Sequence, residues 1–297
     1  MSIENENDND KNLNNMKKHF LYSSPGLMMV LASTVVMLTF CKSEQTLDDV
    51  HILMTLVSNK DAPLTKATVD NVWSGGEQPW VSIDNGTAVA FTALQSGTLV
   101  PLIPLYWQDE SQNITARAWH PDSWTFPIDQ SAGLQPADFI FASTVTGITA
   151  SNYSEKPLVF QHRTAKITVN LTAGTDINHL SNAAVTFYGY ASGNPNTNDT
   201  GNGVIAGSGN GWIIPQNTNG NTYAALLIPR DMTGIPFIKI TIGGNDFFYT
   251  PTAGQAALQQ GMSYVYNITV YMTRIEVEVA NGIVWTDGNE YNITPSA

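Results

Sequence analysis

Apolar and polar residues alternate with a period of two along most of the chain, and Gly, Asn, Asp and Pro interrupt this alternation at short intervals. Such a pattern is typical of half-buried β-strands separated by turns. Only residues 254–260 (GQAALQQ) resemble a helical turn, with Gly261 as its C-terminal cap. The expected strands span residues 87–94, 114–119, 138–144, 164–171, 184–190, 222–228, 236–242, 246–250, 263–271 and 274–279. The sequence therefore predicts an all-β protein, and this number of strands favours two β-sandwiches.

A polar segment at residues 151–157 (SNYSEKP) is the best candidate for a domain boundary. It contains a proline and separates the strand expected at 138–144 from the apolar segments that follow. We therefore expect an N-terminal β-sandwich over residues 67–157 and a C-terminal β-sandwich over residues 158–297.

An uncharged apolar run at residues 27–40 (LMMVLASTVVMLTF) follows Lys17 and Lys18. This is the pattern of a secretory signal peptide, and the run is too short to span a bilayer comfortably. Residues 1–15 are polar and acidic, so Met16 is the expected translation start. We assign residues 1–40 to a lipoprotein signal peptide, because a cysteine, Cys41, follows directly.

Cys41 is the single cysteine of the chain, so it has no partner for an intramolecular disulfide. The sequence LTFC resembles a lipobox, in which the cysteine takes a diacylglyceryl group and becomes the new N-terminus. Phe40 departs from that pattern, because a small residue is usual there, and a buried core cysteine is the alternative reading. We expect Cys41 to be lipidated.

Charge and candidate chemistry exclude several classes of function. The chain has 13 Lys+Arg against 25 Asp+Glu, a formal net charge of −12, which excludes a basic nucleic-acid-binding protein. The five histidines lack metal-ligand spacing, there is no G-x-S-x-G motif, and no convincing carboxylate pair occurs. Residues 194–201 are expected to be a hairpin turn and the glycine-rich residues 201–211 a loop. We therefore expect no enzyme, no cofactor and no metal site.

Residues 158–171 (LVFQHRTAKITVNL) resemble a strand pair of the bacterial fimbrillin family, the lipoprotein pilins of type V pili. His162, Ala165, Lys166 and Ile167 match that motif position by position. Further similar segments follow in the family's order at residues 80–91, 116–121, 138–143, 227–232, 237–249, 258–270 and 275–285, so the resemblance covers about residues 67–288. It implies two tandem transthyretin-like β-sandwich domains and a structural or adhesive subunit of a cell-surface fimbria at the outer membrane.

The resemblance also implies a mode of assembly. In the family, a protease removes an N-terminal segment of the lipidated precursor, and a strand from the next subunit fills the groove that is left. Here Val50, Ile52, Met54 and Leu56 share one side of residues 50–57 (VHILMTLV) at a period of two. These residues fit the removable strand, and the resemblance implies a lipidated propeptide over residues 41–66.

Lys66 and Ala67 align with the place where the family is cut after a basic residue, although many members carry arginine there. Lys60 is a second candidate site, and a solvated lysine at a strand edge is the alternative reading of Lys66. The maturation protease is left open.

The donor strand is expected at the C-terminus, where Ile275, Val277 and Val279 alternate with charged residues. The polar tail 286–297 is a weak donor by itself, so the strand at 274–285 would have to swing out. The implied partners are other fimbrial subunits and a host protein or glycan as adhesive ligand; shaft, tip and anchor roles all remain open.

Other residues have structural readings. His162 is expected to hydrogen-bond within the sandwich, while Arg163 and Lys166 are expected to face solvent. Most of the seven tryptophans are expected to pack in the core, with sugar stacking by one or two as the alternative. The alternative function is accordingly a monomeric outer-surface glycan-binding lipoprotein, which the scattered distribution of aromatic residues disfavours.

Overall fold

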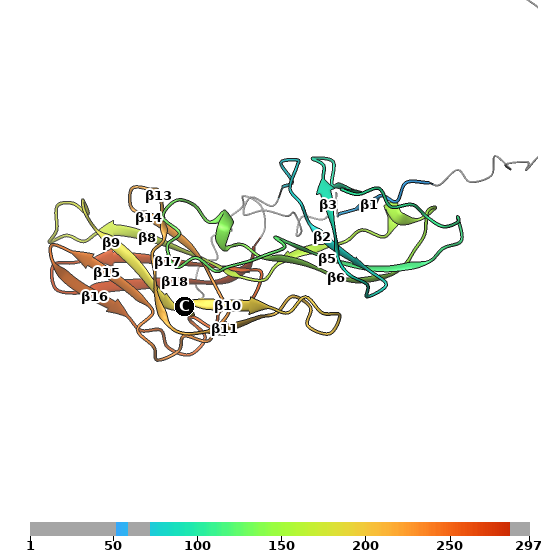
Figure 1. Cartoon of the computed structure of the whole chain (residues 1–297). Helices are drawn as coiled ribbons and strands as arrows, with labels where there is room; N and C mark the ends of the chain where they lie inside the picture. The colour runs from blue at the N-terminus through green and yellow to red at the C-terminus, as the bar shows by residue number, and fades with distance from the viewer. Residues whose placement is uncertain (1–51, 59–71, 286–297) are drawn as a thin grey trace, which may run out of the picture. The chain divides into compact units, whose positions relative to one another are not determined.

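The computed structural model describes residues 52–58 and 72–285, and these residues are almost entirely β-structure (Figure 1). The strands of the first half are β1 (Leu56–Val57), β2 (Trp80–Ile83), β3 (Val89–Ala93), β4 (Thr98–Pro101), β5 (Ile114–His120), β6 (Ile140–Ile148) and β7 (Phe160–His162). Those of the second half are β8 (Ala165–Ala173), β9 (Ala184–Gly189), β10 (Ser192–Pro195), β11 (Ile205–Ser208), β12 (Gly211–Ile213), β13 (Gln216–Asn219), β14 (Thr222–Leu227), β15 (Ile238–Ile242), β16 (Asn245–Tyr249), β17 (Met262–Val270) and β18 (Ile275–Val284). Two short 3₁₀ turns, η1 (Gln135–Ala137) and η2 (Tyr153–Glu155), are the only helical elements of the described residues. The prediction of an all-β fold is confirmed.

The first seven strands form one antiparallel sheet in the order β1-β4-β3-β2-β5-β6-β7. Alternation places apolar side chains on its inner face, as in β3, where Phe91 and Ala93 are fully buried and Thr92 between them is not. They pack with Leu99, Ile114 and Phe160 in a hydrophobic cluster that we call the first core.

The remaining strands form a five-stranded sheet, β13-β14-β8-β17-β18, a four-stranded sheet, β12-β9-β15-β16, and the hairpin β10-β11. Ile167 of β8 and Tyr266 of β17 come from the first of these sheets, and Phe187 and Ile240 from the second. All four are buried in a single cluster, the second core, as expected for two sheets packed face to face in a sandwich.

At the centre of the five-stranded sheet, β8 and β17 run parallel, with registers from Lys166 opposite Ser263 to Ala173 opposite Val270. Every other strand pair is antiparallel among those that the structure describes. The neighbours β17 and β18 lie side by side in Figure 1 and bring the C-terminal end of the described chain to the edge of this sheet.

The division into domains of residues 67–157 and 158–297 stays a prediction. β7 follows the predicted boundary in sequence, and it pairs with β6 in the first sheet. The second core in turn includes Phe139 and Phe141, which precede that boundary.

The helical turn predicted over residues 254–260 is wrong. Ala257 instead forms an antiparallel bridge with Asp231, flanked by a hydrogen bond from the Met232 N–H to the Ala256 carbonyl. Gly254 has a φ of +83°, which a right-handed helix cannot accommodate. Gly261 does adopt a positive φ of +67°, but it leads the chain into β17 and caps no helix.

The glycine-rich segment 201–211 was predicted as a loop, and this is wrong for its second part. β11 occupies residues 205–208 and pairs with β10 through Gly193 opposite Gly207. A Cβ atom on Gly207 would lie 2.2 Å from the ring of Tyr190, so only glycine lets the strand pass there. The hairpin predicted around residues 194–201 is confirmed, since β10 and β11 flank that turn.

Candidate functional site

Residues 52–58 form an extended segment that fills a gap between two parts of the first sheet. On one side, Leu56 of β1 lies opposite Leu99 of β4, and the Met54 N–H donates to the Leu105 carbonyl over 2.7 Å. On the other side, the Leu158 N–H donates to the Val57 carbonyl over 2.8 Å. The segment therefore has backbone partners on both of its edges.

The side chains of this segment are divided between the core and the surface. Met54 is 4% exposed and Leu56 is 1% exposed, and both belong to the first core. Ile52 is 41% exposed and Leu53 is 40% exposed. Of the four residues predicted to share one side, the structure brings Met54 and Leu56 together in the core, leaves Ile52 largely at the surface, and does not describe Val50.

Ser58 is an anchor of this segment that the sequence pattern did not reveal. Its buried hydroxyl donates to the Gly97 carbonyl over 2.9 Å and accepts from the indole N–H of Trp73 over 2.8 Å. Trp73 in turn packs edge-on against Phe160, with ring centroids 5.3 Å apart. A serine next to an apolar strand carries no sequence signal that distinguishes a buried anchor from a solvated turn.

Replacing Gly97 should loosen this anchor. Gly97 has a φ of +83°, and a Cβ atom there would lie 3.2 Å from both oxygens of Ser58. We expect Gly97→Ala to destabilise the first sheet by about 1–2 kcal/mol, because alanine is strained in that conformation and crowds the anchor. Urea unfolding measures the loss of stability. Gly220 also has a positive φ but has open space around it, so Gly220→Ala is the control that separates backbone strain from crowding.

β18 is one of the two edge strands of the five-stranded sheet, and β13 is the other. β18 pairs with β17, from Ile275 opposite Val270 to Val284 opposite Met262, and no other described strand pairs with it. The predicted donor residues Ile275, Val277 and Val279 are partly buried against the second core. Glu276 and Glu278 between them are exposed, so the predicted alternation of this strand is present.

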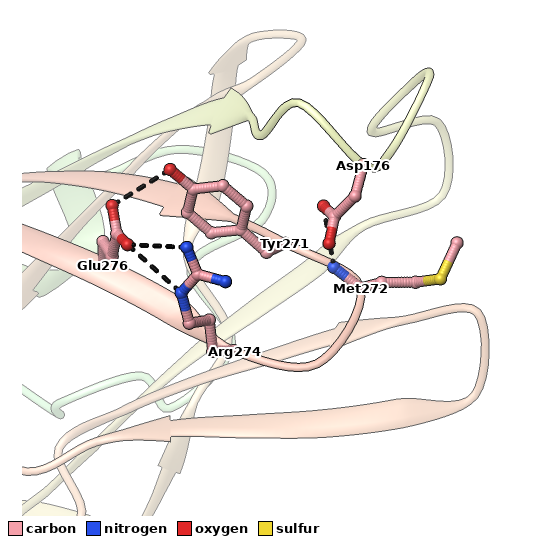
Figure 2. A network of polar contacts seen from close by, with 5 residues as sticks. All are labelled: Asp176, Tyr271, Met272, Arg274 and Glu276. Atoms are coloured by element: carbon pink, nitrogen blue, oxygen red, sulfur yellow. Dashed lines mark hydrogen bonds and ion pairs between the residues drawn. The ribbon is translucent and has the colours of Figure 1, made fainter.

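A polar network holds the turn between β17 and β18 (Figure 2). The Glu276 carboxylate accepts a hydrogen bond from the Tyr271 hydroxyl over 3.0 Å and forms an ion pair with the Arg274 guanidinium at 3.0 Å. The Arg274 guanidinium also lies over the Tyr271 ring, 3.9 Å from its centroid. Figure 2 shows Asp176 reaching this turn from a different segment, where its carboxylate accepts from the Met272 N–H over 3.1 Å.

This network should weaken in acid. Hydrogen bonds from Arg274 and then from Tyr271 hold the pKa of Glu276 below its ordinary value of 4.5. A carboxyl whose pKa is lowered by folding stabilises the folded state above its unfolded pKa, and this contribution is lost as the pH falls through its folded pKa. Hydrogen exchange of the hairpin amides should therefore distinguish wild type from Glu276→Gln at pH 7, and the two should converge in acid. A constant difference at all pH values would contradict this assignment.

The other end of β18 is anchored by Trp285. Its indole is 3% exposed and stacks on the imidazole of His162, with ring centroids 3.7 Å apart and planes at 15°. The backbone N–H of Trp285 donates to the Gly261 carbonyl over 2.9 Å. His162 is held by the buried carboxylate of Asp138, 2.9 Å from its Nδ1 atom. The expectation that His162 hydrogen-bonds internally is confirmed, and its role in holding the end of β18 was not foreseen.

Arg163 was expected to face solvent, and this is wrong. Its side chain is buried, its guanidinium donates to the Phe141 carbonyl over 3.3 Å, and burial lowers its pKa to about 10. The chain bends at residues 163–164 between β7 and β8, so the strict alternation of a strand does not extend across this point. Lys166 is partly buried, with its ammonium 5.7 Å from the ring centroid of Trp285.

The remaining predicted site residues, Cys41, Lys60, Lys66 and Ala67, lie outside the described residues. Over residues 52–58 and 72–285, no three His, Cys, Asp or Glu side chains are grouped to hold a metal ion. In the same part of the chain, no helix has the length and hydropathy needed to cross a membrane.

Comparison with protein families gives a match to the fimbrillin-like family over residues 59–282, which is most of the chain. The chain belongs to the fimbrillin-like family. Fimbrillin-like proteins are fimbrial structural and adhesion proteins, not enzymes, and membership implies a cell-surface fimbrium as location and other fimbrial subunits as partners. A search of curated proteins found no match.

Two solved structures of proteins described as cell adhesion proteins share the fold of this fimbrillin-like chain. The protein from Bacteroides uniformis is 17% identical with a TM-score of 0.65, and the one from Bacteroides ovatus is 17% identical with a TM-score of 0.59. Each comparison covers 80% of this chain and 99% of the other. The all-β architecture of this fimbrillin-like chain is therefore also that of experimentally solved proteins.

Proposed function

We propose that this protein is a structural or adhesive subunit of a cell-surface fimbria, assembled by strand exchange after proteolytic removal of its N-terminal segment. Residues 52–58 carry the proposal, because they complete a sheet and yet are followed in sequence by Lys60 and Lys66. Two buried side chains, Met54 and Leu56, fill the first core from this short segment. A cut after either lysine would leave them held by non-covalent contacts alone.

Loss of the segment would leave an acceptor groove. The hydrogen-bonding partners of residues 52–58 on β4 and at Leu158 would lack partners, and the spaces of Met54 and Leu56 would open to water. Unpaired strand edges bind an added strand through main-chain hydrogen bonds, and the pockets select alternate side chains. The groove therefore suits an extended strand with apolar residues at a period of two.

β18 of a second subunit has the features of that strand. It is already an edge strand, and Ile275, Val277 and Val279 would occupy the pockets while Glu276 and Glu278 face water. Its release requires the turn network around Glu276 and the Trp285 anchor to open. These two anchors keep β18 on its own sheet until a groove is available.

Export as a lipoprotein completes the proposal. The signal peptide over residues 1–40 and lipidation of Cys41 would tether the precursor to the outer membrane, and removal of residues 41–66 would free the subunit from its lipid. The adhesive ligand would be a host protein or a glycan.

Limited trypsin digestion tests the proposal, since trypsin cuts after lysine and arginine. We expect a cut near residues 60–66 to convert the monomer into a ladder of oligomers that resists SDS when the sample is not boiled. Intact mass locates the cut, and gel mobility shows the ladder. Combined Lys60→Gln and Lys66→Gln should abolish both cut and ladder. Val277→Asp should permit the cut and prevent the ladder, because a charge cannot enter the apolar pocket. A wild-type chain that is cut there and stays monomeric would refute strand exchange.

A further inference from the structure

Three aromatic rings and a lysine gather on the outer face of the four-stranded sheet. They are Tyr188 of β9, Trp212 of β12, Lys239 of β15 and Phe248 of β16, and we call them the aromatic patch. Each comes from a different strand, so the patch crosses the whole sheet.

The strand registers place these side chains together. Trp212 lies opposite Tyr188, and Lys239 lies opposite Phe248. The ring of Trp212 is 5.2 Å from that of Tyr188 and 6.1 Å from that of Phe248, measured between centroids. The Lys239 ammonium lies 5.4 Å from the centroid of the Trp212 ring. The four side chains thus form one continuous surface.

Trp212 and Phe248 lie outside both cores, while Tyr188 is a partly buried residue that packs against the second core. Residues next to the patch in sequence, such as Phe187, Ile213 and Ile238, point into the second core and are fully buried. Phe248 is 49% exposed, and Tyr188 and Trp212 are partly exposed. Aromatic pairs on the solvent side of a sheet add cross-strand contacts to folding, and a contiguous exposed aromatic surface can also bind a ligand.

Polar groups suited to hydroxyl ligands border the rings. The Trp212 indole N–H and the Lys239 ammonium make no hydrogen bond or ion pair with any described residue, so both can donate to a ligand. Asp246 lies on the same face as Lys239, and its Oδ1 atom accepts from the Thr241 hydroxyl over 2.5 Å. The second carboxylate oxygen can accept from a ligand hydroxyl.

We propose that the aromatic patch is a glycan-binding site for a neutral pyranose chain. A pyranose ring has an apolar face of C–H groups that stacks on an aromatic ring and an equatorial rim of hydroxyls that needs donors and acceptors. The patch offers both. Neighbouring rings are tilted by 59° and 54°, so the surface is angled and fits a single soluble chain; the flat surface of a crystalline polysaccharide would need coplanar rings.

Charge selects among glycans. The chain carries a formal net charge of −12, and Asp246 borders the patch, so sulfated and uronate-rich polymers are repelled. One ammonium, that of Lys239, does not reverse this balance. The patch shares no residue with the segment 52–58 or with the anchors of β18, so glycan binding does not require polymerisation.

Affinity electrophoresis tests the site with the purified protein. Native gels are cast with soluble galactomannan, arabinoxylan, starch or heparin, and migration is compared with that in a gel without polysaccharide. We expect at least one neutral polymer to retard the protein and heparin to leave it unaffected. Phe248→Ser, at an exposed position, and Lys239→Gln, at a half-buried one, should each weaken the association constant about tenfold, the effect of a lost aromatic or polar contact. Ile103→Ser, which removes an apolar side chain that is 75% exposed elsewhere, should change nothing.

Three outcomes would overturn the proposal. One is that no neutral polymer retards the wild-type protein, and another is that the patch variants are retarded as strongly as wild type. The third is that Phe248→Ser changes the sedimentation of the protein without any effect on polysaccharide binding, which would make the patch a contact between copies. Because uncleaved monomer is used throughout, a negative result leaves strand exchange untouched, and a failed ladder leaves glycan binding untouched.

Discussion

Leu56→Asp should detach residues 52–58 from the first core and lower the free energy of unfolding by about 3 kcal/mol, the scale of exposing a buried leucine. Leu56 is 1% exposed and packs among the apolar residues of the first core, where a carboxylate would be desolvated. The segment can swing out to solvate the charge, so the loss is limited to the free energy with which it docks. Urea unfolding measures this change.

Leu53→Asp is the matched control, because Leu53 belongs to the same segment and is already 40% exposed. Its effect should be within about 0.5 kcal/mol of wild type, as for most surface substitutions. Both variants should become indistinguishable from wild type once the segment has been cut away and washed off. Equal destabilisation by the two substitutions would show that Leu56 does not fill the core as described.

Trp285→Ala should release the end of β18 and destabilise the five-stranded sheet by about 3–5 kcal/mol, the usual cost of removing a buried aromatic ring. The substitution removes the stack on His162 and leaves the buried pair of His162 and Asp138 open to water. Hydrogen exchange along β18 should rise, and after cleavage the ladder should form faster than in wild type, because the donor strand no longer has to break this anchor.

Met272→Ala serves as the control for this prediction. Met272 lies in the turn that leads into β18, and its side chain is 65% exposed. We expect no change in hydrogen exchange or in the rate of ladder formation. If Trp285→Ala slowed the ladder, Trp285 would contribute to binding in the acceptor groove instead of holding β18 in place.

The regular strands could be predicted from the sequence because their environment is regular. β8, β14 and β17 have apolar residues facing the second core, and their positions agree with the predicted strands to within about two residues. β10, β11 and β12 were missed because they are short and rich in glycine and asparagine. Their pairing, such as Gly193 opposite Gly207, leaves no periodic pattern in the chain.

The candidate site was predictable only in part, for a similar reason. The alternation of Ile275, Val277 and Val279 with charged residues is a local property of one strand, and in the structure these three side chains are partly buried while the residues between them are exposed. The anchors join residues far apart in sequence, such as His162 with Trp285 and Ser58 with Gly97. Burial of Arg163 depends on a bend between β7 and β8, and the alternation of apolar and polar residues does not predict such a bend.

The parallel pairing of β8 with β17 has a consequence for folding kinetics. Antiparallel neighbours joined by a short turn pair early, whereas the contact of Lys166 with Ser263 closes a long loop and gives the second half of the chain a high contact order. The central pair of this sheet therefore cannot form until nearly all of the chain is available. β17 and β18 are antiparallel neighbours joined by the short turn at residues 271–274, so they pair with each other early, and the hairpin as a whole then waits to dock beside β8. The rate at which this hairpin docks, as much as the stability of the finished sheet, then sets how long the free edge of β17 is open to pairing with a strand of a neighbouring molecule.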